Sequence, residues 1–149
     1  MMKTIFDKPT RDELITRINS LSENSAAQWG KMNVHQMLKH GALCDEMYLG
    51  KTQFKRAFIG RLFGKMALNA SLKNDAPLRR STPTLPSLII AETTGDLQAE
   101  KNRWISIIGE YADYSKPEFV HTFFGKMTRE QLGYMAYKHI DHHLRQFNC

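Results

Sequence analysis

The sequence has little cysteine and no long apolar run. Cys44 and Cys149 are its two cysteines among 149 residues. Two cysteines without a pattern are too few for a disulfide framework, so we expect a reducing compartment. No stretch approaches the roughly 20 apolar residues that a membrane span needs, and the opening residues lack the apolar core of a signal peptide. We therefore expect a cytoplasmic protein without a membrane partner, folded as a single domain over residues 1–149.

Acidic residues are nearly missing from the segment between Lys51 and Ile90. Eight basic residues stand there beside the single acid Asp75, so the segment carries a net charge of +7. Clustered Lys and Arg can bind phosphate, which raises nucleic-acid binding as an alternative. The phenylalanines of this segment recur at helical spacing, as core residues do, and no recognition motif is present. We expect no nucleic-acid partner, while attraction of an anionic substrate stays open.

Apolar periodicity and helix-capping residues predict four main helices and one shorter amphipathic helix. Solenoid repeats and low-complexity tracts are absent. The main helices are expected over Thr10–Leu21, Asn33–Leu49, Thr94–Ala112 and Thr128–Phe147, and the shorter one over Thr52–Leu68, interrupted near its two glycines. An irregular crossing with three prolines is expected over Asn69–Ile90, and a loop over Ser115–Gly125. Four main helices joined by one long crossing indicate an all-α four-helix bundle.

Two of the helix starts share one sequence pattern. Trp29-Gly-Lys-Met-Asn33 and Phe124-Gly-Lys-Met-Thr128 each end on a capping residue that is followed three positions later by glutamine. This spacing is the capping box, in which the cap side chain and the glutamine side chain each bond the other residue's amide. The repeat has two explanations: one good helix-entry sequence arose twice, or the two helices are pseudo-equivalent partners.

The last predicted helix places histidine on its core-facing side. His139 and His143 are four residues apart, so they lie on the same face as Leu132 and Met135. Imidazole is unusual core filling, and this spacing is typical of metal ligands. The alternative is a pair of core-edge histidines that bond each other or nearby polar side chains. His142 points about 100° away, towards the edge of this face.

A third histidine reaches the same depth if the second and last helices are antiparallel. His40 lies roughly 10 Å past the start of its helix, and His139 and His143 lie roughly 12 and 6 Å before the end of theirs. Parallel helices would separate these side chains. Three neutral imidazoles with open positions suit Zn, Ni, Fe or Cu.

Other polar residues are weaker candidates for the same site. Gln146, Tyr137 and Asp141 are expected as groups that orient the imidazoles, without a ranking among them. His121 is expected to be a surface or turn residue rather than a fourth ligand, and its loop is a candidate wall of the pocket, as is the crossing Asn69–Ile90. His35 is expected to point to solvent, opposite to the apolar face of its helix.

These motifs resemble a known superfamily. The strings Trp29-Gly-Lys-Met-Asn-x-x-Gln-Met-Leu-x-His40, His121-x-Phe-Phe-Gly125 and Lys138-His-x-Asp-His-His-Leu-Arg-Gln-Phe147 are similar to an uncharacterised branch of the DinB/YfiT-like metalloenzymes. The resemblance implies an up-down-down-up four-helix bundle, often dimeric. It also implies a divalent metal (Zn, Ni or Fe) held by the residues that match the superfamily's three histidines, His40, His139 and His143.

The resemblance further implies a class of reaction. Characterised relatives are thiol-dependent S-transferases and a mycothiol-dependent isomerase, in which the metal activates a low-molecular-weight thiol. We therefore expect a metal-dependent transferase or hydrolase that acts on a small molecule. No motif in this chain marks a thiol site. The alternative is a non-catalytic bundle, a ligand-binding or stress-associated protein without bound metal.

Overall fold

The computed structural model describes residues 1–149 as a mostly helical chain with five α-helices and one two-stranded sheet. The elements are α1 (Lys8–Ser20), α2 (Val34–Tyr48), α3 (Phe58–Ser71), α4 (Leu97–Gly109), β1 (Glu118–His121), β2 (Gly125–Thr128) and α5 (Arg129–Gln146). Two short 3-10 helices, η1 (Pro86–Leu88) and η2 (Glu110–Asp113), lie in the connections. The expectation of a mainly helical fold is therefore confirmed. No helix combines the length and apolarity needed to cross a bilayer.

The two predicted capping boxes begin α2 and α5. The Asn33 side chain accepts the Gln36 amide, and the Thr128 side chain accepts the Gln131 amide. In both boxes the glutamine side chain accepts the amide of the cap residue. Each box thus satisfies two backbone donors that the first turn of a helix leaves free. The predicted boundaries of these helices are confirmed to within one residue at each end.

The predicted start of the first helix was wrong. We expected this helix to begin at Thr10, but α1 begins at Lys8 after the cap residue Asp7. Pro9 lies in the first turn, where its missing N–H costs no hydrogen bond. Thr10 is buried inside the helix. Pro9 is therefore compatible with a helix that starts before Thr10.

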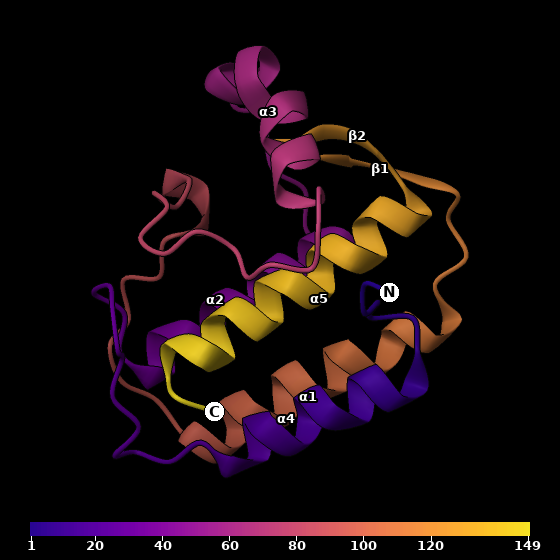
Figure 1. Cartoon of the computed structure of the whole chain (residues 1–149). Coiled ribbons are helices and arrows are strands. Elements are labelled where there is room, and N and C mark those ends of the chain that lie inside the picture. Colours follow the sequence, from indigo (N-terminus) through magenta and orange to yellow (C-terminus); the bar gives the residue numbers. More distant parts are fainter.

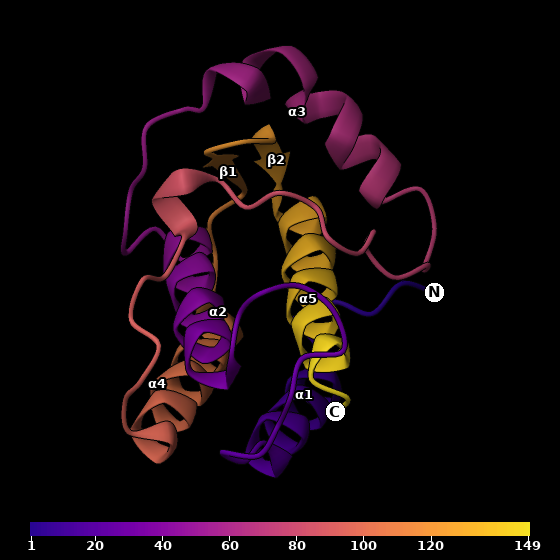
Figure 2. The same cartoon turned by 90° about the vertical axis from the view of Figure 1, so that its left-hand side faces the viewer.

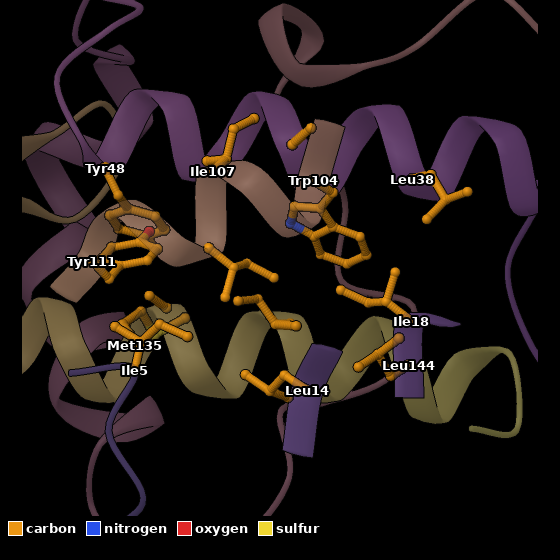
Figure 3. Close-up of a cluster of buried hydrophobic side chains, with 14 of the residues drawn as sticks. Ile5, Leu14, Ile18, Leu38, Tyr48, Trp104, Ile107, Tyr111, Met135 and Leu144 are labelled. Atoms are coloured by element: carbon orange, nitrogen blue, oxygen red, sulfur yellow. The ribbon is translucent and has the colours of Figure 1, made fainter. Parts of the chain in front are cut away.

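The four long helices lie side by side around the core. Figures 1 and 2 show α1 and α5 running in one direction and α2 and α4 in the other. The core is one cluster of 22 buried side chains, to which all four of these helices contribute. Figure 3 shows Trp104 of α4, Leu38 of α2, Leu14 of α1 and Leu144 of α5 meeting inside it. The antiparallel pair of α2 and α5 is the arrangement that the depth argument required.

The shorter helix differs from its prediction in position and in surroundings. We expected it over Thr52–Leu68 with a break near its glycines, but α3 runs unbroken over Phe58–Ser71. Gly60 and Gly64 lie one turn apart, where a Cβ atom would come within 2.4 and 2.1 Å of the Phe123 carbonyl oxygen. The glycines therefore let α3 approach another backbone closely, and they do not end the helix. Figure 1 shows α3 standing outside the four long helices.

A β-hairpin occupies the segment where we expected a loop. β1 and β2 pair antiparallel, with Phe119 opposite Met127 and His121 opposite Gly125. Gly125 has a φ of +79°, a conformation that favours glycine at the end of a tight connection. The prediction failed because a four-residue strand gains its stability from cross-strand pairs rather than from a long local pattern.

Candidate metal centre

Three imidazole rings from two helices converge between α2 and α5. The Nε2 atoms of His40 and His139 are 3.3 Å apart, and those of His143 and His139 are 3.2 Å apart. One nitrogen from each ring lies within 4.8 Å of the other two. The i, i+4 spacing puts His139 and His143 on one face of α5, and antiparallel packing brings His40 of α2 to the same height. The group is thus a candidate site for a metal ion.

The ring nitrogen of His40 that faces away from the other two histidines is held by a backbone carbonyl. His40 Nδ1 is 2.9 Å from the carbonyl oxygen of Leu88, in η1 of the crossing segment. A carbonyl oxygen only accepts hydrogen bonds, so Nδ1 carries the proton and donates it. The neutral ring therefore presents the lone pair of Nε2 to the other two histidines.

The outer nitrogen of His143 is fixed in the same way by a side chain. His143 Nδ1 is 2.9 Å from Gln146 Oε1, and Gln146 Nε2 donates to the Trp29 carbonyl oxygen at 2.7 Å. The Trp29 carbonyl requires the NH₂ group of the amide on its side, which leaves the amide oxygen facing His143. His143 therefore donates through Nδ1 and presents the lone pair of Nε2.

His139 stands between these two acceptors and has no partner on its far side. Its Nδ1 atom is buried and forms no hydrogen bond. Burial, reinforced by the neighbouring rings of His143 and His40, lowers the pKa of His139 well below its usual value. Burial also lowers the pKa of His40, and that of His143 to about 3. All three rings are thus held neutral, which is the form that binds metals.

Two of the three nitrogen–nitrogen distances match a tetrahedral metal site, and all three nitrogens lie within 4.8 Å of one another. At a metal–nitrogen distance of about 2.0–2.1 Å, the edge of a coordination tetrahedron is about 3.3–3.4 Å. The two Nε2–Nε2 distances are 3.3 and 3.2 Å. Three histidines leave at least one further position of such a tetrahedron for another ligand. His139 is half-buried, whereas His40 and His143 are buried.

Hydrogen bonds hold the crossing segment over the face of α2 and α5 that carries the three histidines. Lys138 Nζ donates to three backbone oxygens at the end of α3 and just beyond, those of Ser71, Asn74 and Ala76, at 2.6–2.9 Å. On the α2 side, the Gln36 side chain donates to the Ile90 carbonyl. These bonds hold the segment that supplies the Leu88 carbonyl to His40.

Comparison with known proteins gives a family for the chain. The model of a family of proteins of unknown function, DUF1569, matches residues 4–149. The chain belongs to the DUF1569 family. No curated protein and no solved structure matches it. The DUF1569 match thus spans the candidate centre and nearly the whole chain, and the family's description assigns no chemistry.

Two of the residues that we expected around the site of this DUF1569 chain have their contacts elsewhere. Asp141 forms ion pairs with Arg17 at 2.8 Å and with Arg145 at 2.7 Å, so its carboxylate ties α5 to α1. Tyr137 is half-buried beside Lys3, whose Nζ lies 5.9 Å from the ring centroid. Neither side chain has a hydrogen bond to a ring of the triad.

His142 lies at the edge of the site. Its ring centroid is 5.2 Å from that of His143, and on its other side it packs against Trp29 at 5.5 Å. Burial lowers the pKa of His142, and a hydrogen bond to the Leu78 backbone opposes this shift. His142 is therefore a neighbour of the triad that interacts with the crossing segment.

The structure corrects our expectations for two further histidines. His121 is not a surface or turn residue: it is buried in β1, and its Nδ1 accepts the amides of Phe123 and Phe124 at 3.0 and 3.1 Å. His35 does not point into solvent, because it is 8% exposed and its Nε2 lies 2.8 Å from the Glu23 carboxylate. The chain before α2 folds over His35, which helical periodicity could not predict.

Sequence reasoning missed two contacts of His40. The Leu88 carbonyl comes from an irregular segment 48 residues away, and no sequence signal marks it. The buried Cys44 thiol lies 3.6 Å from His40 Nε2, one turn along α2. Burial raises the pKa of this thiol well above its usual value. The i, i+4 spacing of His40 and Cys44 was a signal that could have found this neighbour.

Proposed function

We propose that this DUF1569 chain is a divalent-metal-dependent enzyme whose ion is held by His40, His139 and His143. The substrate is a small molecule, and the reaction is a transfer or hydrolysis in which a thiol or water attacks an electrophilic centre. The directions of the four long helices support placing the chain with the DinB-like proteins as an up-down-down-up four-helix bundle. By the same resemblance, we propose a homodimer.

One observation carries the metal proposal. Because His40 and His143 both donate through Nδ1, both direct an Nε2 lone pair at the Nε2 atom of His139. His139 Nε2 carries at most one proton, so it can satisfy only one of them, and the other donor beside His40 Nε2 is the weakly donating Cys44 thiol at 3.6 Å. A cation among the three nitrogens satisfies every lone pair that faces the centre.

The chain's own groups would prepare the site for this role. The Leu88 carbonyl and the Gln146 amide hold two rings in the tautomer that ligation requires, and burial keeps them uncharged. Such partners orient ligands and raise their basicity. A metal ion in an open site lowers the pKa of a coordinated thiol or water, so that either becomes a nucleophile near neutral pH.

Metal analysis of protein purified without a polyhistidine tag tests the proposal. After chelation and dialysis, Zn, Ni and Fe are titrated into wild type, His139→Ala and His142→Ala, and bound metal is measured by elemental analysis. His142→Ala removes a neighbouring imidazole from the same helix and serves as the matched control. We expect stoichiometric metal in wild type and His142→Ala and its loss in His139→Ala.

The expected binding also predicts a change in thermal stability. A ligand that binds only the folded chain stabilises it by about 2.7 kcal/mol at a hundred times its dissociation constant. Added metal should therefore raise the melting temperature of wild type and His142→Ala, and leave that of His139→Ala unchanged. Equal metal binding by the two variants, or none by wild type, would overturn the proposal in favour of a non-catalytic bundle.

A further inference from the structure

The outer face of α3 exposes a row of large apolar side chains. Their exposed fractions range from 49% to 76%. They are Phe58, Ile59, Leu62, Phe63 and Met66. Soluble proteins rarely expose contiguous apolar side chains of this size without a binding role. At about 100° per residue these five side chains share one side of the helix.

The opposite side of α3 attaches the helix to the rest of the chain. Gly60, Gly64 and Leu68 are its buried residues, and the two glycines approach the backbone at Phe123. These positions lie roughly opposite the apolar row on the helix. Figures 1 and 2 show α3 beyond the hairpin, away from the helices that enclose the core. The apolar row therefore faces outwards and contributes nothing to the core.

Unpaired cations border this apolar row. Arg61 and Lys65 are exposed, lie one turn apart and flank the row on one side. Neither forms an ion pair within the chain. No acidic residue occurs between Lys51 and Asn74. The partner of this face must therefore supply both apolar contact and negative charge.

We propose that α3 binds the surface of an anionic lipid bilayer. The helix would lie in the interface, with its apolar row among the upper acyl chains and Arg61 and Lys65 on the acidic headgroups. A second copy of the chain is a poorer match, because a symmetric pair of α3 faces would bring like cations together without a carboxylate to compensate them. This association differs from a transmembrane span, whose absence led us to expect no membrane partner.

Binding of α3 to an acidic bilayer would have two separable contributions, one from its apolar side chains and one from its cations. Truncating Leu62 to serine removes one apolar anchor, which should lower vesicle partitioning roughly tenfold. Neutralising Arg61 and Lys65 together should lower it roughly 30-fold on acidic vesicles. High salt screens only the second contribution, so it should weaken binding of wild type more than that of the neutralised variant.

Vesicle flotation of the full-length chain tests the inference. Large vesicles of phosphatidylcholine alone are compared with vesicles that contain a substantial fraction of phosphatidylglycerol. Ile89→Ser is the matched control for Leu62→Ser, because Ile89 is 62% exposed outside α3 and Leu62 is 64% exposed. We expect wild type and Ile89→Ser to float with the acidic vesicles, and Leu62→Ser and the doubly neutralised variant to lose most of this binding.

Several results would overturn the inference. Wild type that does not float, or that floats equally well with neutral vesicles, would do so. Equal binding by Leu62→Ser and Ile89→Ser would also contradict it. If wild type stays off vesicles but forms a dimer that Leu62→Ser abolishes in sedimentation velocity, the face joins two copies of the chain and the lipid proposal falls. Circular dichroism of each variant verifies that its helix content matches that of wild type.

Discussion

The buried carboxylate of Asp45 should make the stability of the protein fall as the pH rises from 5 to 8. Asp45 is fully buried in α2 and accepts hydrogen bonds from Trp104 Nε1 and the Tyr111 hydroxyl, each at 2.7 Å. These two bonds favour the ionised form. Burial outweighs them and raises the pKa of Asp45 to about 7. No cation pairs with the carboxylate to offset the cost of burying its charge.

The direction of the effect follows from proton binding. In the unfolded chain Asp45 titrates near its reference pKa of about 3.9. Between about pH 4 and 7 the folded state therefore holds the proton more tightly than the unfolded state, and unfolding releases it. Relative to its value below pH 4, stability is lost as the pH rises, until the folded state also ionises near pH 7. Three pKa units correspond to a total loss of about 4 kcal/mol, of which about 2–3 kcal/mol falls between pH 5 and 8.

The substitution Asp45→Asn isolates this contribution. An asparagine amide can accept from Trp104 through its oxygen and donate to the Tyr111 hydroxyl, so the polar contacts can be kept without a titrating group. Urea unfolding at pH 5, 6, 7 and 8 gives the difference in unfolding free energy between variant and wild type. We expect this difference to shift by about 2–3 kcal/mol in favour of Asp45→Asn between pH 5 and 8.

Taking differences removes contributions from other titrating groups that the two proteins share. The exposed Glu92 provides the control, because Glu92→Gln should follow wild type at every pH. A difference for Asp45→Asn that stays constant from pH 5 to 8 would refute the reasoning. It would mean that the hydrogen bonds from Trp104 and Tyr111 stabilise the buried anion enough to offset its desolvation.

Two further substitutions test the supports of the site and of α3. Gln146→Ala removes the acceptor that fixes His143, so metal affinity should fall roughly 10- to 100-fold in a competition titration; unchanged affinity would show that the amide does not orient the ring. Gly64→Ala would place a methyl group 2.1 Å from the Phe123 carbonyl oxygen, so amide exchange in α3 should accelerate while the core stays protected. Gly109→Ala meets no atom within 4 Å and should be neutral or stabilising by up to about 1 kcal/mol; equal effects of the two glycine substitutions would contradict the docking of α3.

Local interactions determined the parts of the fold that the sequence predicted well. The boxes at Asn33 and Thr128 satisfy backbone donors within four residues, so they act whatever surrounds the helix. The same locality explains the correct ends of α2 and α5. At α1, proline geometry also acts locally, and the competing pattern at Thr10 led to the wrong start.

Elements that depend on distant partners could not be predicted in this way. The apolar periodicity of α3 predicted a helix with one apolar face, but periodicity does not say what that face contacts. Packing at Gly60 and Gly64 decided that the apolar residues lie on the outside. The hairpin likewise exists because Glu118–His121 and Gly125–Thr128 pair with each other.

The histidine centre also combines contacts fixed within one helix and contacts that depend on tertiary packing. Helical geometry alone put His139 and His143 on one face of α5, and it put Gln146 within reach of His143. Only the antiparallel packing of α2 against α5 brought His40 to them, and only the crossing segment supplied the Leu88 carbonyl. Spacing of three or four residues is fixed by the backbone of one helix. A contact across 48 or 99 residues depends on how the whole core closes.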